Sequence, residues 1–369
     1  RDRNHPSVIV WSAGNESGHG ENHVRAIEQI RAYDPSRPIH HEGEVKRWWH
    51  QRGNEYAGGR NRSNDLINPM YPTIESIVEH AVDSRDPRPV ILCEYSHAMG
   101  NSNGSLAEYW DAFERYQGLQ GGFIWEWVDH GIRRTDEQGR EYWAYGGDFG
   151  EEIHDSNFVA DGLVWPDRTP HPAMHEFRKL AQPLAVRARS VREGRFTVVS
   201  KQDFTSLDWL EGRWQLEVEG EPVDGGALPP LEVPPDGELA VKIDYADPDA
   251  LARPEAYVTF TFTAREATAW CEAGHEVAWE QFRANDLRLP SPADRTAGAP
   301  TASSGAVTVT DEPELAIALD STPLVERGPS LNLFRATTDN DGIRGWAGQD
   351  EKPMGQWLAA GLDTLRRVD

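Results

Sequence analysis

The sequence predicts two kinds of architecture in one chain: an α/β region that forms part of a (β/α)8 TIM barrel, and an all-β region that begins with an immunoglobulin-like β-sandwich. Residues 1–182 alternate strand and helix patterns, whereas residues 183–290 alternate apolar and polar side chains with a period of two. Twelve of the 13 histidines and eight of the 14 tryptophans lie in the first region. This bias predicts a site-bearing domain followed by a scaffold domain.

The α/β region contains the repeating units of a parallel sheet. Apolar runs predict strands and apolar positions at helical spacing predict helices. The expected strands are 7–12, 38–41, 66–71, 89–95 and 122–128, and the expected helices are 23–33, 74–81, 106–116 and 171–180. The strands look buried on both faces, as in a parallel sheet covered by helices. Because a closed barrel needs eight strands, we expect the C-terminal part of a barrel whose first strands precede Arg1 in a longer protein.

The strand pattern changes after Gln182. The segments RFTVVSKQ, RWQLEVEG, LAVKIDY and AYVTFTFTA alternate apolar and polar residues between Gly, Pro and Asp turns, which is typical of a sandwich. Residues 290–305 are rich in Pro, Ala, Ser and Gly and predict a linker. Residues 291–369 are expected to comprise this linker and the truncated start of a large C-terminal β-sandwich domain, because the remainder is too short to bury a core of its own.

The charge of the chain excludes some classes of partner. Lys and Arg number 37 against 61 Asp and Glu, so the net charge is −24 and no basic stripe exists to meet phosphates. We expect no nucleic-acid partner and no membrane binding. Two cysteines make no disulfide framework, and no apolar run approaches ~18 residues, so a cytoplasmic location is expected. The excess of tryptophan leaves two interpretations open, core residues or faces that stack on sugar rings.

Polar side chains follow several predicted strands at their C-terminal ends, where the reacting groups of parallel barrels lie. They are Asn15, Glu16, Tyr71, Glu94, His97 and Trp125. Glu94 is the most unusual, because a carboxylate inside the strand VILCEY is unfavourable unless it is paired or hydrogen-bonded. Two carboxylates across a barrel mouth with aromatic side chains around them favour glycoside hydrolysis, in which one donates a proton and the other attacks the anomeric carbon.

These residues also have structural interpretations. A strand-end glutamate such as Glu16 is more often a helix-terminal or salt-bridged residue, Asn15 could be a turn residue, and His97 could be a hydrogen-bonded core histidine. The segment HGENH places His19 and His23 four residues apart, as in a zinc pair. The metalloprotease pattern needs a glutamate directly after the first histidine, where this chain has glycine, so metal-dependent hydrolysis is the weaker alternative.

Several longer motifs occur together: RDRNHPSVIVWSAGNESGHG, PRPVILCEYSHAMGNS, LQGGFIWEWVDHG, YGGDFGE and DGLVWPDRTPHPAM. In these motifs the chain resembles the large bacterial β-galactosidases of glycoside hydrolase family 2. The resemblance runs from the middle of the catalytic barrel through the following sandwich into the last one. The Asn-Glu element is shared by the wider clan, whereas EYSHAMGNS and DRTPHPAM are more specific to β-galactosidases.

The resemblance implies roles for the strand-end residues. Glu16 matches the acid/base and Glu94 matches the nucleophile of a retaining double displacement. The other four match residues that hold the nucleophile or the sugar: Asn15 would bond the 2-hydroxyl, Tyr71 the nucleophile and His97 the galactose hydroxyls, and Trp125 would give the sugar a stacking face.

The resemblance also implies two cations, Mg2+ and Na+. Glu16 and His19 match positions at the family's magnesium site, with Glu16 a direct ligand, and the other magnesium ligands come from sequence before Arg1. The Phe158 carbonyl and Asp161 match sodium ligands near the galactose 6-hydroxyl. The family commonly has Asn where this chain has Asp161, and the added charge is expected to change the affinity for the ion.

The implied activity is hydrolysis of terminal β-D-galactosyl residues in β-galactosides such as lactose, with a full-length parent that is a homo-oligomer. This chain alone is expected to be inactive or nearly so, because half a barrel lacks part of the sugar site. Two alternatives stay open. One is a same-clan β-glucuronidase or β-mannosidase, although no basic residue for a sugar carboxylate stands out in the motifs. The other is a fragment that binds sugar or assembles with another chain and has no activity itself.

Overall fold

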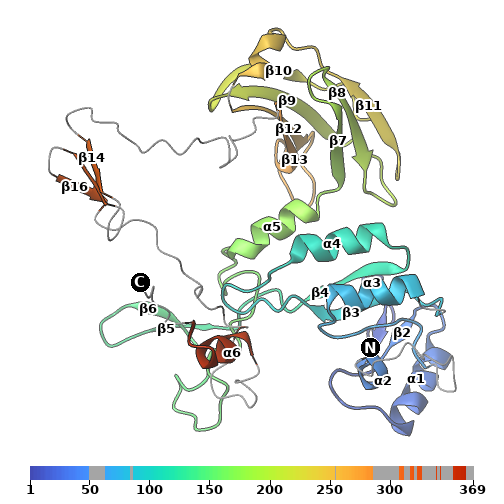
Figure 1. Cartoon of the computed structure of the whole chain (residues 1–369). Coiled ribbons are helices and arrows are strands. Elements are labelled where there is room, and N and C mark those ends of the chain that lie inside the picture. The colour runs from blue at the N-terminus through green and yellow to red at the C-terminus, as the bar shows by residue number, and fades with distance from the viewer. Residues whose placement is uncertain are drawn as a thin grey trace. The chain divides into compact units, whose positions relative to one another are not determined.

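A computed structural model of the chain describes residues 1–49, 63–83, 86–253, 255–285, 307–310, 316–319, 322–325, 338, 341 and 352–362. The chain divides into two compact units (Figure 1). The first comprises Arg1–Leu180 with Phe334–Asp363, and the second comprises Ala181–Leu333 with Thr364–Asp369. None of the helices within the described ranges has the length and apolar character needed to cross a membrane.

Short parallel strands form the sheet of the first unit. β1 (Trp11–Ser12) pairs in parallel with β2 (Ile39–His40), and β3 (Val90–Tyr95) pairs in parallel with β4 (Leu119–Ile124). Each pair has a helix between its strands in the sequence, which is the βα arrangement that the sequence predicts. Single contacts link further segments beside these pairs. They join Asp65 to Ile39 (N–H to carbonyl, 2.9 Å), Ile67 to Val90, Met70 to Glu94, and Val128 to Val164. Across the described residues the strands make no closed barrel.

Three strand predictions were wrong in extent. The strand expected at 7–12 is confined to β1, because the Val8 N–H donates back to the His5 carbonyl in a turn (3.2 Å). The strand expected at 66–71 exists only as isolated bridges. The strand expected at 122–128 is found at Leu119–Ile124, because the backbone beyond it turns to the next segment: the Glu126 N–H donates to the Asp161 carbonyl over 2.8 Å.

The helices that the apolar spacing predicts are present. They are α1 (Glu21–Tyr33), α3 (Ile74–Asp83), α4 (Leu106–Arg115) and α5 (Pro172–Leu180). A further short helix near the C-terminus is α6 (Pro353–Ala359). One helix, α2 (Glu42–Trp49), was not predicted. Its sequence EGEVKRWW places Val45, Trp48 and Trp49 at i, i+3 and i+4, so the apolar stripe of a helix was present in the sequence and was overlooked.

The helices cover one face of the sheet. Figure 1 shows α3 and α4 lying along β3 and β4. Val90, Leu92 and Tyr95 of β3 are buried in one cluster with Leu106 and Ala112 of α4. This cluster is the core of the first unit.

The opposite face of the sheet is open. Ile91 and Cys93 of β3 are half-buried, and Phe123 and Trp127 are 63% and 53% exposed. The prediction that β3 is buried on both faces is therefore wrong. The second face of β3 is thus only half-buried in the described part of the chain.

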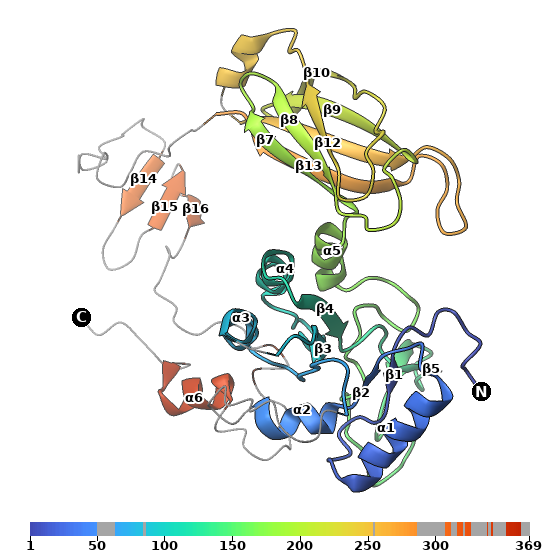
Figure 2. The ribbon, with the colours of Figure 1, turned by 90° about the vertical axis from the view of Figure 1, so that its right-hand side faces the viewer.

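Two antiparallel sheets form the second unit. One has the order β10-β9-β12-β13 and the other has the order β11-β8-β7, and Figure 2 shows the two layers face to face. Four strands against three is the arrangement of an immunoglobulin constant-type sandwich. The strands are β7 (Leu184–Ser190), β8 (Arg195–Ser200), β9 (Leu210–Val218), β10 (Glu221–Ala227), β11 (Glu238–Lys242), β12 (Ala256–Ala264) and β13 (Glu276–Arg283).

The alternation of apolar and polar residues in the sequence matches the alternation of buried and less buried side chains in this sandwich. Buried and half-buried residues alternate along all nine residues of β12. Its Phe260 meets Phe196 of β8 across the two sheets, with ring centroids 4.7 Å apart, and both side chains are buried. Burial of each such side chain stabilises the fold by about 1.5–3 kcal/mol. The apolar stripe that predicted the strands thus forms the core of the second unit.

The remaining described elements are short. β5 (Ile132–Thr135) and β6 (Glu141–Ala144) form an antiparallel hairpin in the first unit. A 3-10 helix, η1, spans Pro248–Ala252, and β14 (Val307–Thr310), β15 (Ala316–Leu319) and β16 (Thr322–Val325) form a three-stranded antiparallel sheet. The linker expected at 290–305 lies outside the described residues. The domain boundaries at 182 and 290 and the separate third domain stay predictions.

Candidate active site

The carboxyl ends of the parallel strands bring four predicted site residues together. Glu16 follows β1, Tyr71 follows the bridging segment, and Glu94 lies near the end of β3. Side-chain hydrogen bonds join the Glu94 carboxyl to Tyr71 and Asn15, and the negative charge of Glu16 acts on it. The separation of the Glu16 and Glu94 carboxyls that a retaining enzyme requires, about 5–5.5 Å, stays a prediction.

The surroundings of Glu94 act on its charge in opposite directions. Burial raises the pKa of the Glu94 carboxyl above its ordinary value, and the charges of Glu16 and Glu42 raise it further. Hydrogen bonds from Tyr71 and Asn15 favour the ionised form and so lower the pKa. Burial and the adjacent Glu94 raise the pKa of the Tyr71 hydroxyl, so Tyr71 keeps its proton and is the donor in this hydrogen bond.

Three residues beyond the strand ends adopt the left-handed backbone conformation that favours glycine. The φ angle is 47° at Glu16, 46° at Tyr71 and 48° at Ser96. Such conformations cost about 1–3 kcal/mol each and gather at functional sites. Glu16 is held by a hydrogen bond from its N–H to Glu42 Oε2 (3.2 Å), and the Asn103 side chain donates to the Ser96 carbonyl. The motif EYSHAMGNSN therefore encodes a fixed loop directly after β3.

The other predicted sugar-site residues gather around Asp161. Trp125 Nε1 donates to Asp161 Oδ2 (3.2 Å), and His97 Nε2 lies 3.9 Å from the same oxygen. The His97 ring stacks on Phe158 with centroids 5.6 Å apart and is 6.0 Å from the Tyr71 ring. Trp125 is 38% exposed, so its indole is accessible to a ligand. The Tyr71–His97 contact links this group to Glu94.

A buried pair holds the segment that carries Asp161. Asp129 Oδ1 accepts the Gly162 N–H (2.7 Å), and Asp129 Oδ2 lies 2.9 Å from His171 Nε2. The His171 ring stacks on Trp165 with centroids 4.6 Å apart. Gly162 has no room for a side chain, because a Cβ there would lie 2.3 Å from the Asp129 nitrogen. Through His171, the motif DRTPHPAM thus helps to hold the segment that carries Asp161.

Sequence reasoning missed two carboxylates of this region. Glu42 is 1% exposed and accepts the Glu16 N–H. The Glu126 carboxyl interacts with that of Asp161, and its Oε1 lies 3.1 Å from His130 Nε2. Burial and the Asp161 charge raise the pKa of Glu126. The signal that could have identified them was position, because Glu42 follows β2 as Glu16 follows β1, and Glu126 lies just beyond β4.

Three histidines pack beside the loop that carries Glu16. The rings of His23 and His41 stack with centroids 4.3 Å apart, and His19 lies 5.6 Å from His41. His41 Nε2 is 2.8 Å from the Gly18 carbonyl, and His23 Nε2 is 3.3 Å from Ser17 Oγ. These contacts therefore fix the loop.

The described residues fit the two implied cations differently. Among them, no group of three or more His, Cys, Asp or Glu side chains is arranged to hold a metal ion. Glu16 and His19 therefore do not make a magnesium site by themselves. Asp161 is 3% exposed, and its Oδ1 has no hydrogen-bond partner in the described part of the chain. A buried carboxylate oxygen without a donor suits a cation.

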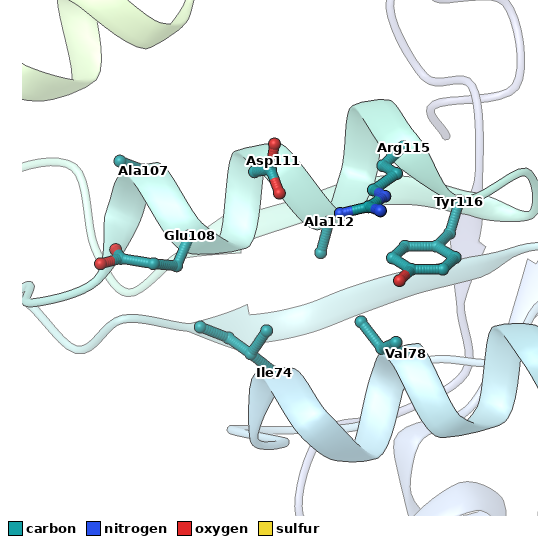
Figure 3. Close-up of a pocket in the computed structure, with 8 residues that line it drawn as sticks. All are labelled: Ile74, Val78, Ala107, Glu108, Asp111, Ala112, Arg115 and Tyr116. Atoms are coloured by element: carbon teal, nitrogen blue, oxygen red, sulfur yellow. The ribbon is translucent and has the colours of Figure 1, made fainter.

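A groove on the outer helical face is separate from these residues. It has a volume of about 450 Å³ and lies between α3 and α4. Figure 3 shows Ile74 and Val78 of α3 on one side, facing Ala112 and Tyr116 from the end of α4. None of the predicted site residues lines it. The groove is on the side of the helices, whereas the candidate site is at the strand ends.

Comparison with known families accounts for this combination of fold and site. The model of glycosyl hydrolases family 2, TIM barrel domain, matches residues 1–186, and the model of beta-galactosidase, domain 4, matches residues 196–285. The chain therefore belongs to glycosyl hydrolase family 2. Its TIM barrel portion is followed by the β-rich domain 4, in the order that the two units show.

Within that family the similar proteins are bacterial β-galactosidases. The chain is 38% identical to the beta-galactosidase of Pectobacterium atrosepticum over 303 residues, 79% of this chain and 27% of that protein. It is 40% identical to that of Klebsiella pneumoniae over 306 residues, 79% of this chain and 27% of that protein. It is 35% identical to that of Vibrio cholerae serotype O1 over 397 residues, 99% of this chain and 36% of that protein. The chain thus spans between 27% and 36% of the length of these relatives.

Proposed function

We propose that this chain carries the reacting carboxyls of a retaining β-galactosidase. Glu94 is the nucleophile and Glu16 is the acid/base. The observation that carries the proposal is the environment of Glu94: a carboxyl near a strand end, with hydrogen bonds from Tyr71 and Asn15, and with Glu16 acting on its charge. Membership of the family supports the same assignment.

The proposed reaction has two displacements. First, the Glu94 carboxylate attacks the anomeric carbon, the bond from that carbon to the leaving oxygen breaks, and Glu16 gives its proton to that oxygen. A galactosyl ester of Glu94 results. Second, Glu16 takes a proton from water, the water oxygen attacks the anomeric carbon, and the ester bond breaks. Glu94 returns as a carboxylate and Glu16 as an acid.

Tyr71 and Asn15 assist both displacements. Each donates a hydrogen bond to Glu94, and a bond of this kind to a charged group contributes about 1.5–3 kcal/mol. They hold the carboxylate in its attacking position before the first step and stabilise it again as the leaving group of the second. Asn15 is also proposed to bond the sugar 2-hydroxyl, a contact that strengthens in the transition state.

The residues around Asp161 are proposed to hold the galactosyl unit. His97 would bond its hydroxyls, and Trp125 would stack against its apolar face. A cation held by Asp161 and the Phe158 carbonyl would supply positive charge next to the sugar 6-hydroxyl when bound. The exposed indole of Trp125 and the unpartnered oxygen of Asp161 support these roles. No step is assigned to magnesium, because the described residues do not fit it.

The proposal for the whole protein is hydrolysis of β-galactosides such as lactose by a cytoplasmic homo-oligomer. We further propose that this chain by itself turns over galactosides far more slowly than the 1–10³ s⁻¹ typical of enzymes. The support is that the parallel strands of the described residues form pairs and no closed barrel. Contacts to the sugar from further barrel strands would contribute to binding the transition state.

A hybrid enzyme tests the proposal. This chain would replace the 36% of the Vibrio cholerae relative with which it aligns, and hydrolysis of a nitrophenyl β-galactoside would be measured. Glu94→Gln is expected to lower turnover by several orders of magnitude, because it removes the nucleophile. Glu79→Gln makes the same change of charge on the exposed side of α3 and is expected to leave turnover unchanged. Near-normal turnover by the Glu94→Gln hybrid would refute the assignment.

A further inference from the structure

The loop that carries Glu16 rests on the junction of β2 and α2. Three successive residues of that junction, His41, Glu42 and Gly43, lie against the loop. His41 Nε2 is 2.8 Å from the Gly18 carbonyl, and Glu42 Oε2 accepts the Glu16 N–H over 3.2 Å. Gly43 has no room for a side chain, because a Cβ there would overlap the Gly18 carbonyl oxygen. The place of the Glu16 backbone is therefore set by this junction.

Glu42 is the unusual residue of the junction. Its side chain is 1% exposed, and among the described residues the Glu16 N–H is the one hydrogen bond that its carboxylate accepts. Glu42 is the first residue of α2, where the helix N-terminus supplies partial positive charge. A buried carboxylate with so few partners is unfavourable to folding. Stability alone therefore gives little reason for a glutamate at this position.

We propose that Glu42 is a positioning residue for the acid/base Glu16, an inference that rests on the function proposed above. The φ angle of 47° at Glu16 belongs to the left-handed region, which a residue other than glycine keeps only where its surroundings hold it. A hydrogen bond to a carboxylate is stronger than one to a neutral acceptor, so Glu42 holds the Glu16 amide in that conformation. The backbone there fixes the direction of the Glu16 side chain, and thus the place where its proton is given.

Galactosides with different leaving groups separate this role from support of the fold. In the first displacement Glu16 gives its proton to the leaving oxygen. A phenolate leaves slowly without that proton, whereas a dinitrophenolate is a much weaker base and leaves without it. The ratio kcat/KM reports the steps up to formation of the galactosyl ester. A misplaced Glu16 therefore lowers kcat/KM for a phenyl β-galactoside selectively, whereas damage to the fold or to the attack by Glu94 lowers it for both substrates.

Variants of the hybrid enzyme measure this selectivity. Glu42→Ala is expected to lower kcat/KM for the phenyl galactoside about 10²-fold, the loss that misplacement of a reacting group by about 1 Å causes, and to change the dinitrophenyl value by less than about threefold. Glu42→Gln keeps an acceptor oxygen in the same place. Because a neutral acceptor makes the weaker bond, it should lower the phenyl value by only about fivefold.

Glu44→Ala is the matched control. It removes another buried carboxylate of α2, one that accepts the Ser63 hydroxyl, so it perturbs the same helix without touching the Glu16 N–H. It is expected to leave the ratio of the two kcat/KM values as in the parent. Far-ultraviolet circular dichroism would confirm that each variant is folded, and Glu42→Gln decides the test if Glu42→Ala does not fold.

Hydrogen exchange tests the contact in this chain alone, without any requirement for turnover. Glu42→Ala is expected to speed exchange of the Glu16 amide by about tenfold or more, because that amide loses its acceptor. Glu44→Ala is expected to leave this exchange unchanged. The rates would be measured by mass spectrometry on the peptide that contains Glu16.

Either of two results would overturn the inference. Equal losses for the two galactosides in Glu42→Ala would show that Glu42 only supports the fold, and unchanged exchange at Glu16 would show that Glu42 does not hold this amide. Glu16→Ala separates such a failure from failure of the proposed function. If Glu16→Ala slows the phenyl galactoside selectively and Glu42→Ala does not, this inference alone fails. If Glu16→Ala is not selective either, the acid/base assignment fails and the inference with it.

Discussion

Replacement of Asp129 by alanine tests how the segment that carries Asp161 is held in place. Asp129 is buried and accepts two hydrogen bonds, from the Gly162 N–H at 2.7 Å and from His171 Nε2 at 2.9 Å. The first holds the residue next to Asp161, and the second ties this segment to the start of α5. Alanine removes the carboxylate that accepts both hydrogen bonds, so the Gly162 N–H and the His171 ring are left buried without this partner.

The expected loss follows from these two contacts. A buried donor without an acceptor costs about 1–3 kcal/mol, so Asp129→Ala should destabilise the first unit by about 2–6 kcal/mol. This is a large part of the ~5–15 kcal/mol that stabilises a typical domain. Asp129→Asn keeps an acceptor for Gly162 and loses the charged partner of His171. It should therefore cost about half as much.

Urea unfolding and hydrogen exchange would measure the two effects separately. The urea midpoint gives the loss of stability, and exchange measured by mass spectrometry on the peptide that contains Gly162 gives the local loss of protection. Asp155→Ala, at an exposed position of the same unit, is the control. Unchanged protection at Gly162 and a midpoint for Asp129→Ala equal to that of the control would refute the supporting role.

Two further predictions concern Glu94 and the sandwich core. Tyr71→Phe removes a hydrogen-bond donor that lowers the pKa of Glu94, so this pKa should rise further. The acidic limb of the pH–rate profile of the hybrid enzyme should therefore move to higher pH. An acidic limb at the same pH would contradict the hydrogen bond. Phe260→Ala should destabilise the second unit by about 3–5 kcal/mol in urea, because it empties a fully buried position. Phe204→Ala, at a position that is 94% exposed, should change stability little, and equal effects of the two would contradict the assignment of the core.

Long periodic segments were predictable from the sequence. The alternation of AYVTFTFTA corresponds residue by residue to β12, and the apolar spacing near residues 74 and 106 corresponds to α3 and α4. In each case one face packs on a core, so burial leaves a period in the sequence. The short parallel strands leave no such period. β1 and β2 are two residues long. Where such a short strand begins and ends depends on which backbone groups of the neighbouring strand it pairs with.

The candidate site was predictable where an unusual residue marks it. A carboxylate in an apolar strand identifies Glu94, and the Asn-Glu pair after β1 identifies Glu16. Glu42 and Glu126 carried a similar mark, because Glu42 directly follows the strand expected at 38–41 and Glu126 lies inside the strand expected at 122–128. Both were overlooked, and their partners, the Glu16 N–H on Glu42 and the Asp161 carboxyl beside Glu126, could be found only from the fold.

Covalent trapping tests the central claim most directly. A dinitrophenyl 2-deoxy-2-fluoro-β-galactoside reacts by the first displacement and resists the second, so the sugar stays on the nucleophile and mass spectrometry identifies the residue. Because each protein molecule is labelled once, the adduct accumulates even where turnover is slow. Both this chain and the hybrid enzyme would be treated. The account predicts one added sugar per chain, on Glu94, and none in Glu94→Gln. An adduct on any other residue, or hydrolysis by the hybrid enzyme without an adduct on Glu94, would contradict it.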